Sequence, residues 1–230
     1  WDVSSVTRMH EMFKDASVFN RNISGWTTSS LTDISGMFFN AIAFTQNLNG
    51  WNVSNVNNMN NTFRKANAFD QPLNNWNTSN VSLLSGTFRA NDVFNQDLSS
   101  WDTSSVTQMQ NTFMDNTVFN NGQSSGVSNT LQWDTSTVTR MDNMFEEATA
   151  FNGNISGWNV SNVTQMDRMF FNARVFNQDL SNWNTSSATT LQGMFNGATI
   201  FNNGLSAGVS SMIMNWSTSS VTTIESTFAS

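Results

Sequence analysis

The chain has 230 residues, which is long enough for one large or two small domains, and its net charge of −7 with only nine Lys and Arg argues against nucleic acid as a partner. It has no Cys and one His, so disulfides and thiolate sites are excluded and almost no material remains for a His-based zinc site or a Ser-His relay. No apolar stretch is long enough for a transmembrane helix, so we expect no direct membrane insertion.

Tryptophan marks an internal repeat that runs through the whole sequence. Successive Trp residues are 25 residues apart, except for two longer intervals of 32 and 33. We call each unit a coil and number its columns from the Trp, so that column 13 is Phe in all nine coils and column 19 is Phe in the eight coils that reach it. The coils start at Trp1, Trp26, Trp51, Trp76, Trp101, Trp133, Trp158, Trp183 and Trp216.

A 25-residue unit cannot bury its own apolar side, whereas stacked units bury a continuous core. The pattern therefore predicts a single solenoid domain over residues 1–230, with loop insertions at about 121–132 and 203–215. The chain opens and stops in mid-pattern, with no capping unit at either end. We expect it to be a piece of a longer array.

Within a coil, the hydrophobic period changes along the chain. The stretch Ile23–Thr28 has the apolar spacing of a leucine-rich-repeat strand, which would point Trp26 and Thr28 inward and Thr27 outward. Columns 6, 9, 12, 13 and 16 then follow a helical or 3-10 spacing, and Thr139-x-x-Asp142 resembles a capping box. The predicted fold is a leucine-rich-repeat-like solenoid with one short parallel strand and one short helix or 3-10 turn per coil.

The repeat resembles that of a known family. The segment from Trp158 to Trp183, WNVSNVTQMDRMFFNARVFNQDLSNW, is similar to the 25-residue repeat of BspA-like leucine-rich-repeat surface proteins, and this likeness covers the whole chain. The resemblance implies a secreted or cell-surface protein that acts in adhesion and is not an enzyme. It carries over no catalytic residue and no fixed binding motif.

The two insertions match each other and both contain G-x-S-x-G, the nucleophile-elbow pattern of hydrolases. Because the only His is His10, in the first coil, catalysis is disfavoured and flexible loops that bulge from the solenoid are expected. The second insertion also carries an apolar run, Met212-Ile213-Met214. Scattered Asn-Gln-Asp runs do not repeat as a calcium site would, so no metal or other cofactor is expected.

The outward face of the predicted strand is the candidate binding face, because solenoids use such extended surfaces. It consists of column 2: Asp2, Thr27, Asn52, Asn77, Asp102, Asp134, Asn159, Asn184 and Ser217. Column 14 varies most, and its two aromatic members, Phe39 and Phe171, are candidate contact residues. Candidate glycosylation sites, should the source be eukaryotic, are Asn22, Asn52, Asn60, Asn77, Asn80, Asn154, Asn159, Asn162, Asn184 and Asn215.

Together these features predict a non-enzymatic extracellular repeat protein for adhesion, binding of proteins or glycans, or surface assembly. Two alternatives stay open. One is a structural segment of an extracellular filament that self-associates, and the other is an ice-binding solenoid with ladders of Thr, Ser and Asn.

Overall fold

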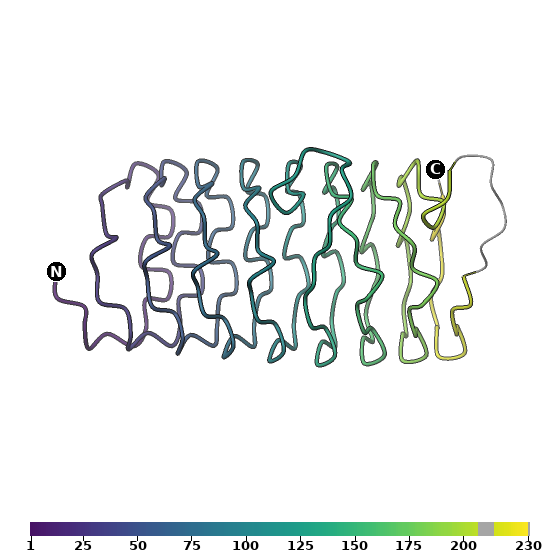
Figure 1. Ribbon diagram of the computed structural model, residues 1–230, viewed down its shortest axis with the longest axis horizontal. Helices are drawn as coiled ribbons and strands as arrows, with labels where there is room; N and C mark the ends of the chain where they lie inside the picture. Colours follow the sequence, from purple (N-terminus) through teal and green to yellow (C-terminus); the bar gives the residue numbers. More distant parts are fainter. Residues whose placement is uncertain (207–213, 230) are drawn as a thin grey trace.

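The computed structural model describes residues 1–206 and 214–229. The coils stack side by side along one long axis, with the two ends of the chain at opposite ends of the stack (Figure 1). The described residues contain no helix, and their strand pairing is limited to single parallel bridges. Eight of these bridges join column 8 of successive coils, from Arg8–Asp33 to Thr190–Thr223, and one further bridge joins Thr130 to Asn154. The chain is therefore a repeat solenoid whose coils consist mainly of turns.

The strand predicted at Ile23–Thr28 is not present. Ser24 and Gly25 form a turn in which the amide N–H of Trp26 donates to the carbonyl oxygen of Ile23 at 3.1 Å. The turn places the side chains of columns 23 and 1 on the same inner side. Its sequence therefore has the same apolar spacing as a leucine-rich-repeat strand. Burial follows the prediction nonetheless, because Thr28 is buried, Trp26 is half-buried and Thr27 is exposed.

Consecutive tight turns occupy columns 9–16, where a helix or 3-10 turn was expected. Backbone amides alternate between two kinds of partner: Phe63 donates to Thr87 of the next coil at 2.8 Å, whereas Arg64 donates within its own coil to Asn61 at 3.2 Å. Column 11 of this coil has a positive φ, 57° at Asn61, and so does column 15. Such a backbone cannot continue as a helix, so the short helix of the leucine-rich-repeat-like prediction is not confirmed.

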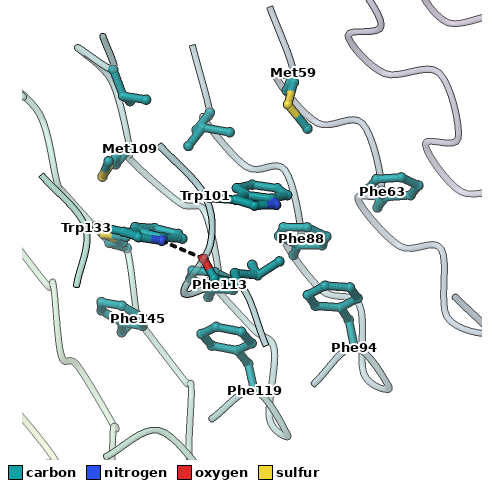
Figure 2. Close-up of a cluster of buried hydrophobic side chains, with 14 of the residues drawn as sticks. Met59, Phe63, Phe88, Phe94, Trp101, Met109, Phe113, Phe119, Trp133 and Phe145 are labelled. Carbon is teal, nitrogen blue, oxygen red and sulfur yellow. Dashed lines mark hydrogen bonds between the residues drawn. The ribbon is translucent and has the colours of Figure 1, made fainter. Parts of the chain in front are cut away.

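The core consists of three aromatic ladders that run through the stack. Column 13 forms one of them, with ring centroids of Phe88 5.7 Å from those of both Phe63 and Phe113. The column 19 ring stacks on the column 13 ring of its own coil, 4.0 Å apart for Phe88 and Phe94. The tryptophans form the third ladder, as Figure 2 shows for Trp101 and Trp133. The aromatic columns that repeat without exception are therefore those that stack.

The first insertion does not bulge freely, contrary to the prediction of a flexible loop. It folds over the next two coils: the amide of Gly126 donates to the carbonyl of Ala150 at 3.0 Å, and Ser128 Oγ donates to Gln178 Oε1 at 3.3 Å. Space for it comes from Gly153, which occupies column 21, where four other coils carry Gln46, Gln71, Gln96 and Gln178. A Cβ atom at Gly153 would lie 3.2 Å from Asn129 Oδ1 of the loop.

The second insertion starts in the same way as the first. Asn203 Oδ1 accepts the amide N–H of Leu180 at 2.8 Å, as Asn121 Oδ1 accepts that of Leu98 at 2.8 Å. Residues 207–213, which include Met212, Ile213 and the end of the second G-x-S-x-G motif, lie outside the described residues. Met214 is half-buried against the core.

Candidate functional site

Column 2, the predicted binding face, caps a turn in its own coil. Asp102 Oδ1 accepts the backbone N–H of Ser104 at 3.0 Å and the Ser104 hydroxyl at 2.6 Å. These two hydrogen bonds lower the pKa of Asp102, with the hydroxyl bond the larger cause. In six other coils the backbone N–H of the column 4 Ser donates in the same way to the column 2 side chain, which is Asp2, Asn52, Asn77, Asp134, Asn159 or Asn184. In these seven coils the Asx turn accounts for the Ser in column 4, and it leaves the Asn and Asp side chains of column 2 exposed.

Columns 5 and 7 tie each coil to the one before it. The Asn55 amide group donates to the carbonyl of Ser29 at 2.8 Å, and Thr164 Oγ1 donates to the carbonyl of Thr139 at 3.2 Å. Because these polar side chains already have partners within the solenoid, repetition here serves stability. Four of the candidate glycosylation sites are also less accessible than the sequence suggested. The side-chain amides of Asn80 and Asn162 donate hydrogen bonds to the preceding coil, and Asn60 and Asn154 are half-buried.

The residues that differ from coil to coil gather on one other side, which we call the variable face. It comprises columns 8, 10, 11, 14 and 15, next to the parallel bridges. Seven of the nine Lys and Arg residues lie on it: Arg8, Lys14, Arg64, Lys65, Arg89, Arg140 and Arg168. Side-chain contacts join its columns and coils into one surface: Lys14 Nζ donates to Glu11 at 2.8 Å within a coil, and His10 Nδ1 lies 2.8 Å from Ser35 Oγ of the next coil.

The two aromatic candidates, Phe39 and Phe171, lie on this variable face and are half-buried rather than fully exposed. Each is covered by cations. The Phe39 ring centroid is 5.5 Å from Lys14 Nζ and 4.9 Å from Arg64 Cζ, and that of Phe171 is 3.7 Å from Arg168 Cζ. Cation–π contact of this kind fixes the position of the charged groups.

The ion pairs on the variable face differ along the stack in which columns carry the Arg and which carry the acid. Arg8 pairs with Asp33 at 3.1 Å, whereas the guanidinium of Arg168 donates two hydrogen bonds to the buried carboxylate of Glu146. Asp167 lies near Asp142, and burial, then the charge of Asp142, raises the pKa of Asp167. The acids of these pairs are largely buried, so each pair holds its charged groups in place, and the change of partner gives successive coils different charge patterns.

A hollow of about 400 Å³ opens on the variable face between the first three coils. It exists because the second coil carries Ser35 and Gly36 where its neighbours carry larger side chains. Its lining is formed by His10, Glu11, Ser35, Gly36, Phe39, Asn58, Asn60, Asn61 and Arg64. Sequence reasoning missed this site, although the Ser-Gly pair in columns 10 and 11 was its visible signal.

The described part of the chain offers neither a metal site nor a membrane-spanning helix. No group of three or more His, Asp or Glu side chains suited to a metal ion occurs within residues 1–206 and 214–229. In the same part of the chain no helix is long and apolar enough to cross a membrane.

The stacked coils and the single variable face define the protein as a repeat solenoid. The family model described as "Mycoplasma protein of unknown function, DUF285" matches residues 1–70, 40–130 and 121–230. The chain therefore belongs to the DUF285 family. No curated protein and no solved structure matches it.

Proposed function

We propose that the protein is a non-enzymatic extracellular binding protein, for adhesion or surface assembly, and that the variable face is its main contact surface. One observation carries this proposal: most of the charged residues lie in columns 8, 10, 11, 14 and 15 and differ from coil to coil, while the polar columns 4, 5 and 7 repeat and bond within the solenoid. A repeated column offers every partner the same group. A column that holds Lys14, Phe39, Arg64 and Met114 in turn can distinguish one partner from another.

Binding by such a face would be spread over several coils. Each contact is shallow, and the sum over the array supplies the affinity, as in other solenoids with extended binding surfaces. Column 2 remains a second proposed contact surface, which would bind through backbone-anchored Asn and Asp side chains. The partners we propose are extracellular proteins or glycans, or further copies of the chain.

The finer family relationship is also part of the proposal. The 25-residue period and the parallel bridge in every coil support kinship with BspA-like leucine-rich-repeat surface proteins. The location outside the cell depends on that kinship.

A solid-phase assay tests the proposed function. The 230-residue chain is offered to immobilised matrix proteins, to a glycan array and to whole cells, at low and high salt. We expect binding to at least one surface, weakened by salt because the variable face carries most of the charge. An absence of binding in all three formats would overturn the proposal.

A further inference from the structure

The hollow between the first three coils holds more hydrogen-bond donors than its own acceptors can use. Within the described residues, the guanidinium of Arg64 makes no hydrogen bond and no ion pair, and its buried Nε has no partner. The side-chain N–H groups of Asn58, Asn60 and Asn61 likewise donate to nothing in the described part of the chain. An Arg with unused donors at the edge of a hollow is equipped to hold an anion in two parallel hydrogen bonds.

Most acceptors near these donors are already occupied, and of the three lining amides only Asn61 Oδ1 accepts no hydrogen bond within the described residues. Asn58 Oδ1 accepts the amide N–H of Asn60 at 3.1 Å, and Asn60 Oδ1 accepts that of Ser85 at 2.8 Å. Glu11 binds Lys14 at 2.8 Å, and Asp33 binds Arg8 and Ser35. A ligand that satisfies this hollow must therefore bring acceptors and negative charge.

Local electrostatics point in the same direction. Burial, then repulsion by Arg89, lowers the pKa of Arg64, which indicates a cation without a close counter-ion. The acid whose charge acts on Arg64 is Asp115, two coils further along, and it is already paired with Arg89 at 3.7 Å. A bound carboxylate would remove this imbalance.

We propose that the hollow binds an acidic saccharide, with the sugar carboxylate on Arg64 and ring hydroxyls on the amides of Asn58, Asn60 and Asn61. This inference rests on the proposed function, because it names the ligand class of the same variable face. An acidic peptide could also place a carboxylate on Arg64, so it is compared in the test, but the three lining amides favour a ligand with several hydroxyl groups. Phe39 is the one large apolar side chain in the lining, and Lys14 and Arg64 cover its ring.

The test is calorimetric titration of the whole chain with a glucuronate trisaccharide and, in parallel, with the neutral glucose trisaccharide. We expect binding of the acidic sugar only. Arg64→Met should weaken it at least about tenfold, as loss of one charge-assisted bidentate contact implies. Arg174→Met is the matched control, because it removes the same charge at an exposed residue outside both the hollow and the variable face. It should change the affinity less than about threefold.

A second pair of variants tests the shape of the hollow. Gly36→Asn fills it at a φ of 61° that Asn tolerates, and Gly193→Asn makes the same change in column 11 of a distant coil at φ 61°. Only Gly36→Asn should abolish binding. Equal binding of both sugars, or undiminished binding by Arg64→Met and Gly36→Asn, would overturn the inference.

The outcomes separate this inference from the proposed function. If the chain adheres to cells or matrix but ignores the acidic trisaccharide, the saccharide site is wrong and the binding function stands. If an acidic peptide binds through Arg64 and the trisaccharide does not, the ligand class is wrong. If the chain binds nothing in any format, both proposals fail.

Discussion

The indole Nε1 of Trp133 donates a hydrogen bond to the carbonyl oxygen of Leu98 at 3.1 Å, the contact drawn as a dashed line in Figure 2. The same bond, from Trp to column 23 two coils earlier, recurs in every coil from Trp51 onward. Each Trp thus fills the core and also joins two coils. Phe could supply the ring but not the donor, which explains why column 1 is never Phe.

Replacement of Trp101 by Phe should therefore expose the function of the indole N–H. The carbonyl oxygen of Leu73 keeps the amide N–H of Trp76 at 3.1 Å but loses its second hydrogen bond, and we expect a loss of about 0.5–1.5 kcal/mol in the free energy of unfolding. Trp26→Phe is the control, because no such bond from Trp26 exists in the described coils and its side chain is half-buried. Denaturant unfolding of both variants measures the difference, and equal losses would contradict this explanation.

Core substitutions should follow position in the stack. Phe88→Ala removes a fully buried ring with neighbours on both sides, and we expect a loss of about 3–5 kcal/mol. Phe228 is 63% exposed and stacks on Phe195 alone, so Phe228→Ala should cost about half as much or less. Phe39→Ala, at a half-buried position, should cost under about 1 kcal/mol. Urea melts give the order, and a Phe39 variant as damaged as the Phe88 variant would refute it.

Docking of the first insertion should depend on Gly153. Gly153→Gln restores the side chain that other coils carry in column 21, and it would occupy the space of the loop. We expect faster proteolysis between Gly122 and Ser128, together with a lower unfolding midpoint, because the new Cβ atom would also lie 2.8 Å from the ring of the buried Phe151. Gly157→Gln is the control, because nothing lies within 4 Å of a Cβ atom at Gly157. Unchanged proteolysis of the Gly153 variant would show that the loop does not need this space.

The carboxyl of Asp167 makes stability depend on pH. Its folded-state pKa is raised by burial and by Asp142, so ionisation disfavours the folded state, and stability declines as pH rises from the ordinary value of 3.8 through the raised pKa. Asp167→Asn should therefore stabilise the protein at pH 7, with a gain that shrinks toward pH 3. Asp92→Asn, at an exposed position, is the control. Thermal melts across this range test the sign, and a destabilised Asp167→Asn variant at pH 7 would contradict it.

Sequence reasoning located the inward columns because they repeat, but it could not distinguish a helix from successive turns. Both arrangements bring residues three or four positions apart to the same side, as Phe13 and Ala16 show. A signal was present in columns 11 and 15, where Asn, Asp and Gly recur, since these residues tolerate positive φ. The parallel bridge in column 8 was hidden, because it is made by the backbone while its side chains range from Arg8 to Leu83.

The site was less predictable than the fold. Column 2 attracted attention as an exposed ladder, yet its hydrogen bonds are local, and a distance of two residues in sequence is typical of Asx turns. The variable face required the structure, because only the path of the chain brings columns 8, 10 and 14 together. The docking of the insertion could have been anticipated from Gly153, which interrupts a column of Gln directly after the longer coil.

The measurement that tests the central claim most directly compares two triple variants in the solid-phase assay. Arg64→Asn/Arg89→Asn/Met114→Asn gives column 14 the residue that Asn196 supplies naturally, whereas Asn52→Asp/Asn77→Asp/Asn159→Asp gives column 2 the residue of Asp102. Both sets retain residues that the fold already accepts, and both make the chain more negative. We predict that the first variant loses binding and the second keeps it. Binding that survives the first set of changes and disappears with the second would contradict the account.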